Sequence, residues 1–158
     1  MARITDVAAY LCENYPHKSE LSKTRLTKLV YLSDWKAAQK VRQQMTGIKW
    51  YFHNFGPYVP DVVEAVESDP RFAITSSINH YGDPKMEISV REGVNTSVGL
   101  SKEEKSLLDE VIAETSPLYW NAFIEHVYAT PPIEKSNRYR LLNLLEFAQA
   151  PSVVETSP

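Results

Sequence analysis

The chain has 158 residues, of which 43% are hydrophobic and 23% charged, a composition that excludes a fibrous or intrinsically disordered protein. Its 17 basic and 20 acidic residues give a formal net charge of -3, so the chain does not have the basic excess that usually accompanies binding to duplex nucleic acid. A single cysteine excludes an intramolecular disulfide and a thiolate metal cluster.

Two helices are predicted in the N-terminal part of the chain. The first begins at Thr5 or Asp6, both able to act as N-caps, and ends at Pro16. The second covers residues 22–40, and apolar side chains occupy most of its circumference. A helix that is apolar on most sides usually lies at the centre of a bundle. Lys28 lies at the edge of the apolar side, where its amine is expected to reach water or a partner group.

An aromatic segment follows, around the pair Gly56-Pro57. Residues 48–55 are predicted to be extended, with a turn at Gly56-Pro57, because a residue before proline avoids the helical region. Pro60 suits the first turn of a helix that ends near Ser68. The aromatic side chains can pack in the core, form a rigid protein-binding patch or stack on bases, although base stacking normally accompanies a basic groove. They are Trp50, Tyr51, Phe52, Phe55 and Tyr58.

The next stretch changes from helical to alternating spacing. Alternation of apolar residues over 72–90, around a loop at 81–84, predicts a β-hairpin. Ser101 and Glu104 have the spacing of a capping box, so a helix is predicted to begin there.

Two further helices complete the predicted fold. One begins at Ser116-Pro117 and stops at Thr130, and an aliphatic one covers 137–149. We expect residues 1–150 to form a single domain and residues 151–158 a disordered tail. The sequence thus predicts a mainly α (α+β) fold, a compact bundle of about six helices with one small β-hairpin insertion.

The sequence contains no recognisable catalytic or ligand-binding motif. None of the four histidines has a second ligand at the spacing of a helical zinc site, and the five glycines form no phosphate-binding loop. Cys12 and His126 lie on apolar helix faces and are interpreted as core residues. We therefore expect no metal, no cofactor and no enzymatic activity. No apolar run reaches the roughly 20 residues that span a bilayer, and no signal peptide is apparent, so a cytoplasmic protein without membrane contact is expected.

Two segments resemble a known family. Residues 25–34, RLTKLVYLSD, are similar to the KLxYL helix of the Panacea domain, also called the SocA-like antitoxin domain. Trp50, followed six residues later by Gly56-Pro57, resembles the W…GP element of the same domain. The order and separation of the two elements match, and the resemblance covers residues 4–127.

The resemblance implies an antitoxin of a bacterial or phage toxin–antitoxin system. Such a protein binds and neutralises a cognate protein toxin encoded beside it, for example an alarmone-synthetase-like enzyme. One branch of the family is a proteolytic adaptor that delivers its toxin to a protease. A nucleic-acid-binding transcriptional regulator is the other alternative, because helices followed by a hairpin could resemble a winged helix, although the acidic balance argues against it. A homodimer, joined through Leu142 or Leu145 of the last helix, is also left open.

The aromatic segment is the predicted partner-binding site, because a few rigid aromatic anchors supply most of the energy of a typical protein interface. Gly56 and Pro57 are expected to fix the geometry of these anchors. The anchors are Trp50, Tyr51, His53, Phe55 and Tyr58.

Overall fold

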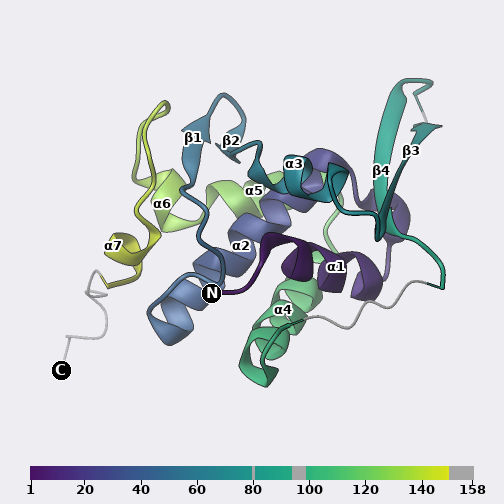
Figure 1. The fold of residues 1–158 in the computed structure, drawn as a ribbon. Coiled ribbons are helices and arrows are strands. Elements are labelled where there is room, and N and C mark those ends of the chain that lie inside the picture. Colours follow the sequence, from purple (N-terminus) through teal and green to yellow (C-terminus); the bar gives the residue numbers. More distant parts are fainter. Residues whose placement is uncertain (80, 94–98, 150–158) are drawn as a thin grey trace.

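The structure is a computed structural model that describes residues 1–79, 81–93 and 99–149 (Figure 1). The predicted disordered tail, residues 151–158, lies outside the described residues. In the described part the chain forms seven α-helices and two small antiparallel sheets of two strands each, which confirms a mainly helical fold. The prediction of one hairpin was incomplete, because the aromatic segment forms a second one.

The elements have the following bounds. The helices are α1 (Ile4–Asn14), α2 (Lys23–Val41), α3 (Asp61–Glu67), α4 (Lys102–Thr115), α5 (Trp120–Tyr128), α6 (Pro131–Glu134) and α7 (Leu144–Gln149). The strands are β1 (Tyr51–His53), β2 (Gly56–Tyr58), β3 (Phe72–Ile78) and β4 (Pro84–Val90). A short 3-10 helix, Lys18–Glu20, joins α1 to α2.

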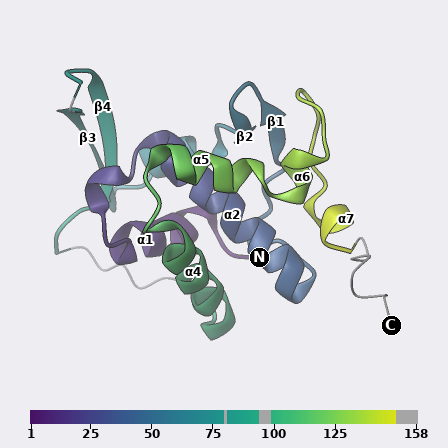
Figure 2. The same cartoon turned by 180° about the vertical axis from the view of Figure 1, so that it is seen from behind.

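Helix α2 is the centre of the fold, as its all-round apolar pattern predicted. It passes behind α1 in Figure 1 and behind α5 in Figure 2, so it is covered on both sides. Thirteen of its 19 residues are buried. The helix begins where the Ser22 hydroxyl accepts the backbone N–H of Arg25, and it ends at Arg42, whose φ of 62° is left-handed. The remaining elements are therefore positioned by the side chains that α2 presents to each of them.

The carboxylate of Asp34, in the middle of α2, holds the returning chain against the helix. One oxygen accepts the backbone N–H of Thr46 at 2.8 Å, and the other accepts the Thr46 hydroxyl at 2.6 Å and the indole N–H of Trp50 at 2.8 Å. Gln44 adds a longer bond of 3.3 Å. Burial raises the pKa of Asp34 to about 6, although the hydrogen bonds from Thr46 and Trp50 act in the opposite direction. These bonds fix the start of β1.

The β3–β4 hairpin and the capping box of α4 both form as predicted. The hairpin pairs Phe72 with Val90 at its base, and Figures 1 and 2 show it projecting from the body of the molecule. At the start of α4 the Ser101 hydroxyl accepts the N–H of Glu104 at 3.1 Å, and the Glu104 carboxylate accepts the N–H of Ser101 at 2.8 Å. Local patterns are sufficient to define both elements.

The sequence predicted that a helix begins at Ser116, but α5 begins four residues later, at Trp120. Residues 116 and 117 form a turn instead, because the buried guanidinium of Arg25 binds carbonyl groups on both sides of it. Its Nη2 donates to the carbonyl of Thr115 at 3.2 Å and to that of Leu118 at 2.9 Å. A charged donor buried on α2 therefore overrides the usual preference for proline at a helix start.

The last helix is also shorter than predicted, because residues 138–142 run alongside β1. The N–H of Tyr139 donates to the carbonyl of Phe52 at 2.6 Å, and the N–H of Phe52 donates to the carbonyl of Arg140 at 2.9 Å. The N–H of Leu142 then donates to the carbonyl of Trp50 at 2.8 Å. This β-type pairing outweighs the helical spacing of the leucines. Leu142, one of the two leucines that the sequence left open as a homodimer contact, is buried, whereas Leu141 is 69% exposed.

We predict that Asp34→Ala destabilises the fold strongly, because it leaves the buried donors of Thr46 and Trp50 without an acceptor. The expected loss in the free energy of unfolding is on the order of 3 kcal/mol, measured by urea denaturation. Asp34→Asn, which keeps one acceptor oxygen, should lose less. An unfolding free energy for Asp34→Ala within about 0.5 kcal/mol of wild type would contradict this role of the carboxylate.

Candidate functional site

The predicted site residues divide into a buried group and an exposed group. Trp50, Gly56 and Pro57 are buried, Tyr51 is half-buried, and the others are exposed. The prediction that Trp50 contacts a partner is corrected, because its indole ring packs edge-on against Tyr31 at 5.4 Å and donates to Asp34. Trp50 is a supporting residue beneath the site. The exposed residues are His53, Phe55 and Tyr58.

The exposed group is presented by the β1–β2 hairpin. Tyr51 pairs with Tyr58 and His53 pairs with Gly56, so the tight turn consists of Asn54 and Phe55. The predicted turn at Gly56-Pro57 is therefore displaced, because both residues lie inside β2. Gly56 has a φ of 100°, and a Cβ there would lie 3.1 Å from the ring of Tyr128. This position requires glycine on both grounds, conformational and steric.

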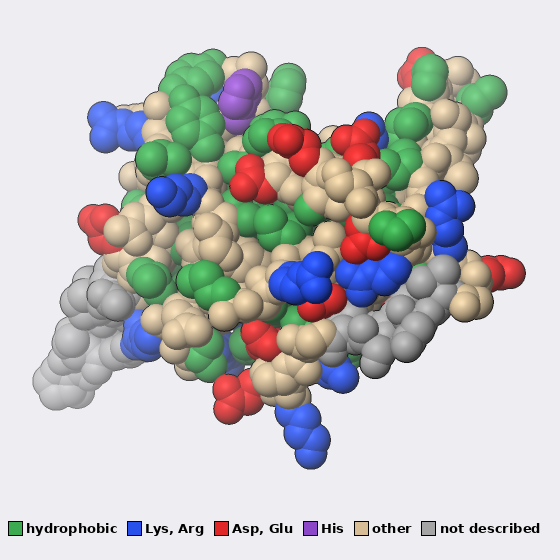
Figure 3. All heavy atoms as spheres, viewed as in Figure 1, with side chains coloured by type: hydrophobic (Ala, Val, Ile, Leu, Met, Phe, Trp, Pro, Cys, Tyr) green, Lys and Arg blue, Asp and Glu red, His purple; other side chains and the backbone are tan. Residues whose placement is uncertain are grey.

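Five aromatic rings and one aliphatic side chain form one surface, which we call the aromatic patch. The ring of His53 lies at its centre, with centroid distances of 5.9 Å to Tyr51, 6.1 Å to Tyr58 and 6.2 Å to Tyr139. Figure 3 shows hydrophobic side chains gathered around a histidine at the end of the molecule that carries this hairpin. The patch consists of Tyr51, His53, Phe55, Tyr58, Tyr139 and Leu141.

The patch is accessible to a partner. Phe55, at the tip of the turn, is 79% exposed, Tyr139 is 60% exposed and Tyr58 is 40% exposed. Tyr139 and Leu141 were missed from the sequence, because they were predicted on a helix remote from the aromatic segment. No local signal could have placed them here, since the pairing of β1 with residues 138–142 joins segments far apart in the sequence.

A buried amine supports the hairpin from below. Lys28, on α2, is 2% exposed, and its Nζ donates only a long bond of 3.4 Å to the carbonyl of Pro57 in β2. Burial lowers the pKa of this amine to about 8. No carboxylate of the described residues lies within ion-pairing distance of it. Of the two expected environments for the Lys28 amine, water or a partner group, the structure shows the second, because the amine contacts the hairpin backbone.

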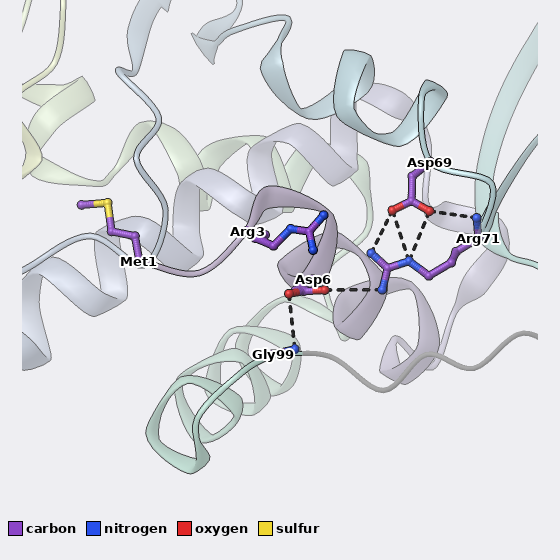
Figure 4. Close-up of a pocket in the computed structure, with 6 residues that line it drawn as sticks. All are labelled: Met1, Arg3, Asp6, Asp69, Arg71 and Gly99. Atoms are coloured by element: carbon purple, nitrogen blue, oxygen red, sulfur yellow. Dashed lines mark hydrogen bonds and ion pairs between the residues drawn. The ribbon is translucent and has the colours of Figure 1, made fainter.

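A cavity of about 540 Å³ lies elsewhere, beside α1, and it is lined by an ion-pair network (Figure 4). Arg71 binds Asp69 through two nitrogens and lies 3.4 Å from Asp6, which in turn accepts the N–H of Gly99. The guanidinium of Arg71 holds the pKa of Asp69 below its usual value. Because Arg71 pairs with both carboxylates that line this cavity, Asp6 and Asp69, the network is interpreted as structural.

Other candidate chemistry finds no support in the described residues. Burial raises the pKa of the Cys12 thiol to about 12, so the reactive thiolate is disfavoured. The described part of the chain contains no cluster of three or more His, Cys, Asp or Glu side chains that could hold a metal ion. None of the helices described is long and apolar enough to cross a membrane.

Comparison with known proteins identifies the domain. The family model described as "Antitoxin SocA-like, Panacea domain" matches residues 26–132. The matched region begins inside α2, includes the β1–β2 hairpin and ends inside α6. Comparison with curated proteins and with solved structures found no significant match. The residues 138–142 that complete the aromatic patch lie beyond the matched region.

We predict that Lys28→Met, which keeps the side-chain volume, changes how stability depends on pH. The folded pKa of about 8 lies below the ordinary 10.5, so the unfolded chain binds more protons between these values and the wild-type unfolding free energy rises with pH there. Lys28→Met should be more stable at pH 7, by up to about 3 kcal/mol, and this advantage should decrease above pH 8 and vanish only above pH 10.5.

Urea denaturation at a series of pH values measures the difference between the two proteins. Lys102→Met, at an exposed lysine of α4, is the matched control and should follow the wild-type profile. Parallel profiles of Lys28→Met and wild type across this range would show that the amine is not held in a desolvated position.

Proposed function

The chain belongs to the family of SocA-like antitoxins with a Panacea domain, and from this premise we propose that it neutralises a cognate protein toxin by direct binding through the aromatic patch. The system would be a bacterial or phage toxin–antitoxin pair, as the family implies. The observation that carries the proposal is the cluster of exposed rings centred on His53. In this proposal the chain supplies a surface and takes no part in catalysis.

The patch has the composition of an energetic centre in a protein interface. Such centres are enriched in Tyr, Trp and Arg, and their side chains bury a large area at a small entropic cost. Three tyrosines meet around one histidine here, and Phe55 extends beyond them at the turn. A contiguous exposed apolar patch on a small protein usually marks an interaction site. The arrangement therefore suits contact with another protein.

The patch is also rigidly supported, which reduces the entropic cost of binding. Tyr51 and Tyr58 are paired across β1 and β2, and Trp50 anchors the start of β1 to Asp34. The other edge of β1 is held by three backbone hydrogen bonds to residues 138–142. Because this part of the backbone is already ordered in the free protein, its ordering costs little free energy on binding. More of the free energy of the contacts then contributes to affinity.

Neutralisation then requires that the patch cover or distort the active site of the toxin. Phe55 is the natural anchor, because it is the most exposed hydrophobic side chain of the patch. The half-buried Tyr51 and the central His53 would form the floor of the contact, with Tyr58 at its side. The toxin could be an alarmone-synthetase-like enzyme, which is the kind of partner that the family implies.

The test is co-expression of this chain with the product of the neighbouring gene. Rescue of growth together with co-elution of the two proteins on a sizing column is the expected result. Inhibition of the purified toxin by the purified chain would indicate occlusion. Rescue that instead requires a cellular protease, with falling toxin levels, would indicate delivery to that protease. A neighbouring product that is harmless, or that remains lethal, would contradict the proposal.

We predict that Tyr58→Ala and Phe55→Ala each weaken toxin binding at least about tenfold while the melting temperature stays within a few degrees of wild type. The loss follows from removing exposed anchors whose side chains contribute little to the core. Isothermal titration calorimetry and thermal unfolding measure the two quantities separately.

Tyr119→Ala is the matched control, because Tyr119 is an 82% exposed tyrosine that precedes α5, outside the patch. Its affinity for the toxin should equal that of wild type. A large loss of thermal stability in Tyr58→Ala would instead assign Tyr58 to the core, and equal binding by all three variants would exclude the patch as the interface.

A further inference from the structure

We infer that the chain forms a two-fold symmetric homodimer in which the β3 strands of two copies pair edge to edge, giving an antiparallel sheet of four strands. The observation that carries this inference is the outer edge of β3, turned away from β4, which we call the free edge. It lies on the projecting β3–β4 hairpin, well apart from the β1–β2 hairpin that presents the aromatic patch (Figures 1 and 2). The inference therefore goes beyond the proposed function and does not depend on a toxin.

Backbone groups on the free edge have no partner in the described part of the chain. The N–H of Ile88 points away from β3, because it donates to the carbonyl of Leu21 at 2.8 Å. Ile88 pairs with Ile74 across the hairpin, so Ile74 and every second residue after it also turn their N–H and C=O groups outward. None of the hydrogen bonds among the described residues reaches these outward groups. They belong to Ile74, Ser76 and Ile78.

The outer edge of β4 is protected, whereas the free edge of β3 is not. Natural sheets protect their edges with charges, prolines, bulges or covering segments. On β4, Pro84 has no N–H, and Lys85 and Glu87 are charged. Ser22 also covers part of that edge through a bridge to Glu87. The strand β3 has the sequence FAITSSI, without charge or proline, and its pairing with β4 is regular along its whole length. Its free edge therefore suits the addition of another strand.

A second copy of β3 fits the free edge in one register. A two-fold axis at Ser76 places this residue opposite its own copy and places Ile74 opposite Ile78 of the second copy. Each facing pair then exchanges two backbone hydrogen bonds, so all the outward groups find partners. The pairing ends at Ile74, because the N–H of Phe72 already donates to the carbonyl of Asp69 at 3.2 Å.

The side chains are self-complementary in the same register, which favours a second copy over an unrelated strand. On one face Ile78, which is 74% exposed, comes to lie beside Ile74 of the second copy. Met86, 38% exposed and paired with the central residue of β3, borders this apolar contact. On the other face, the row of side chains that begins with Glu87 of one copy ends with Lys85 of the other. Like charges therefore do not face each other across the dimer.

The dimer is expected to be weak, because only a few residues of each copy pair. We expect a Kd between about 1 μM and 1 mM. Because the free edge lies apart from the aromatic patch, the dimer would carry two such patches and could bind two partner molecules.

The experiment is sedimentation equilibrium of the purified chain alone, from about 1 μM to about 1 mM. The expected result for wild type is a mass that rises with concentration toward that of a dimer. Ser76→Pro removes the N–H at the two-fold axis, and Ser76→Lys places two like charges opposite each other. Each variant should raise the Kd at least about tenfold. Because the backbone groups of Ser76 point away from β4, both variants keep the bonds between β3 and β4, and thermal unfolding verifies that they are folded.

Ser106→Lys, at an exposed serine of α4, is the matched control for net charge and should dimerise as wild type does. A wild-type chain that stays monomeric over the whole concentration range overturns the inference. A dimer that both variants of Ser76 retain also overturns it, since the contact would then lie at another surface.

The edge could instead receive an extended segment of another protein. A monomeric chain whose binding to the product of the neighbouring gene is lost in Ser76→Pro would assign the free edge to that product and overturn the inference. Dimerisation is measured without any partner, whereas the proposed function is tested by co-expression, so failure of one is distinguishable from failure of the other.

Discussion

A single buried carboxylate, that of Asp34, determines where the aromatic patch lies on the molecule. Its oxygens bind the backbone and hydroxyl of Thr46 and the indole of Trp50, so the chain that leaves α2 returns to a fixed position beside the helix. Trp50 immediately precedes β1, and β1 in turn aligns β2 on one edge and residues 138–142 on the other. A surface open to solvent is thus oriented by a group that has no contact with solvent.

The central helix contains two further buried charged side chains, and each is bound by a different part of the chain. Arg25 donates to Tyr15 and to the carbonyls around the turn before α5, and its guanidinium lies 4.2 Å from the ring of Phe123. Lys28 contacts β2. Apolar contact is non-directional, whereas hydrogen bonds are directional. The apolar side chains of α2 therefore drive its burial, and its polar ones set the orientation of the neighbours.

Local patterns in the sequence were sufficient where an element depends on its own residues. The alternation over 72–90 and the Ser101–Glu104 capping box predicted β3–β4 and the start of α4. The motifs at residues 25–34 and around Trp50 together predicted the family. Local patterns were insufficient where hydrogen bonds to residues distant in the sequence outweigh the local preference for a helix or strand. The leucine spacing near Leu141 indicates a helix, and only the backbone of β1 turns that segment into an extended one. The burial of Trp50 likewise depends on an acceptor in another element.

The backbone hydrogen bonds between β1 and residues 138–142 hold this surface in place without depending on its side chains. These bonds use N–H and C=O groups, which nearly every residue provides, so they place few demands on the outward side chains. Tyr139, Arg140 and Leu141 also lie beyond the region shared with the family, which ends at residue 132. Diversification can therefore act on this segment while the core stays unchanged, and a lineage can acquire a new binding specificity without having to evolve a new fold.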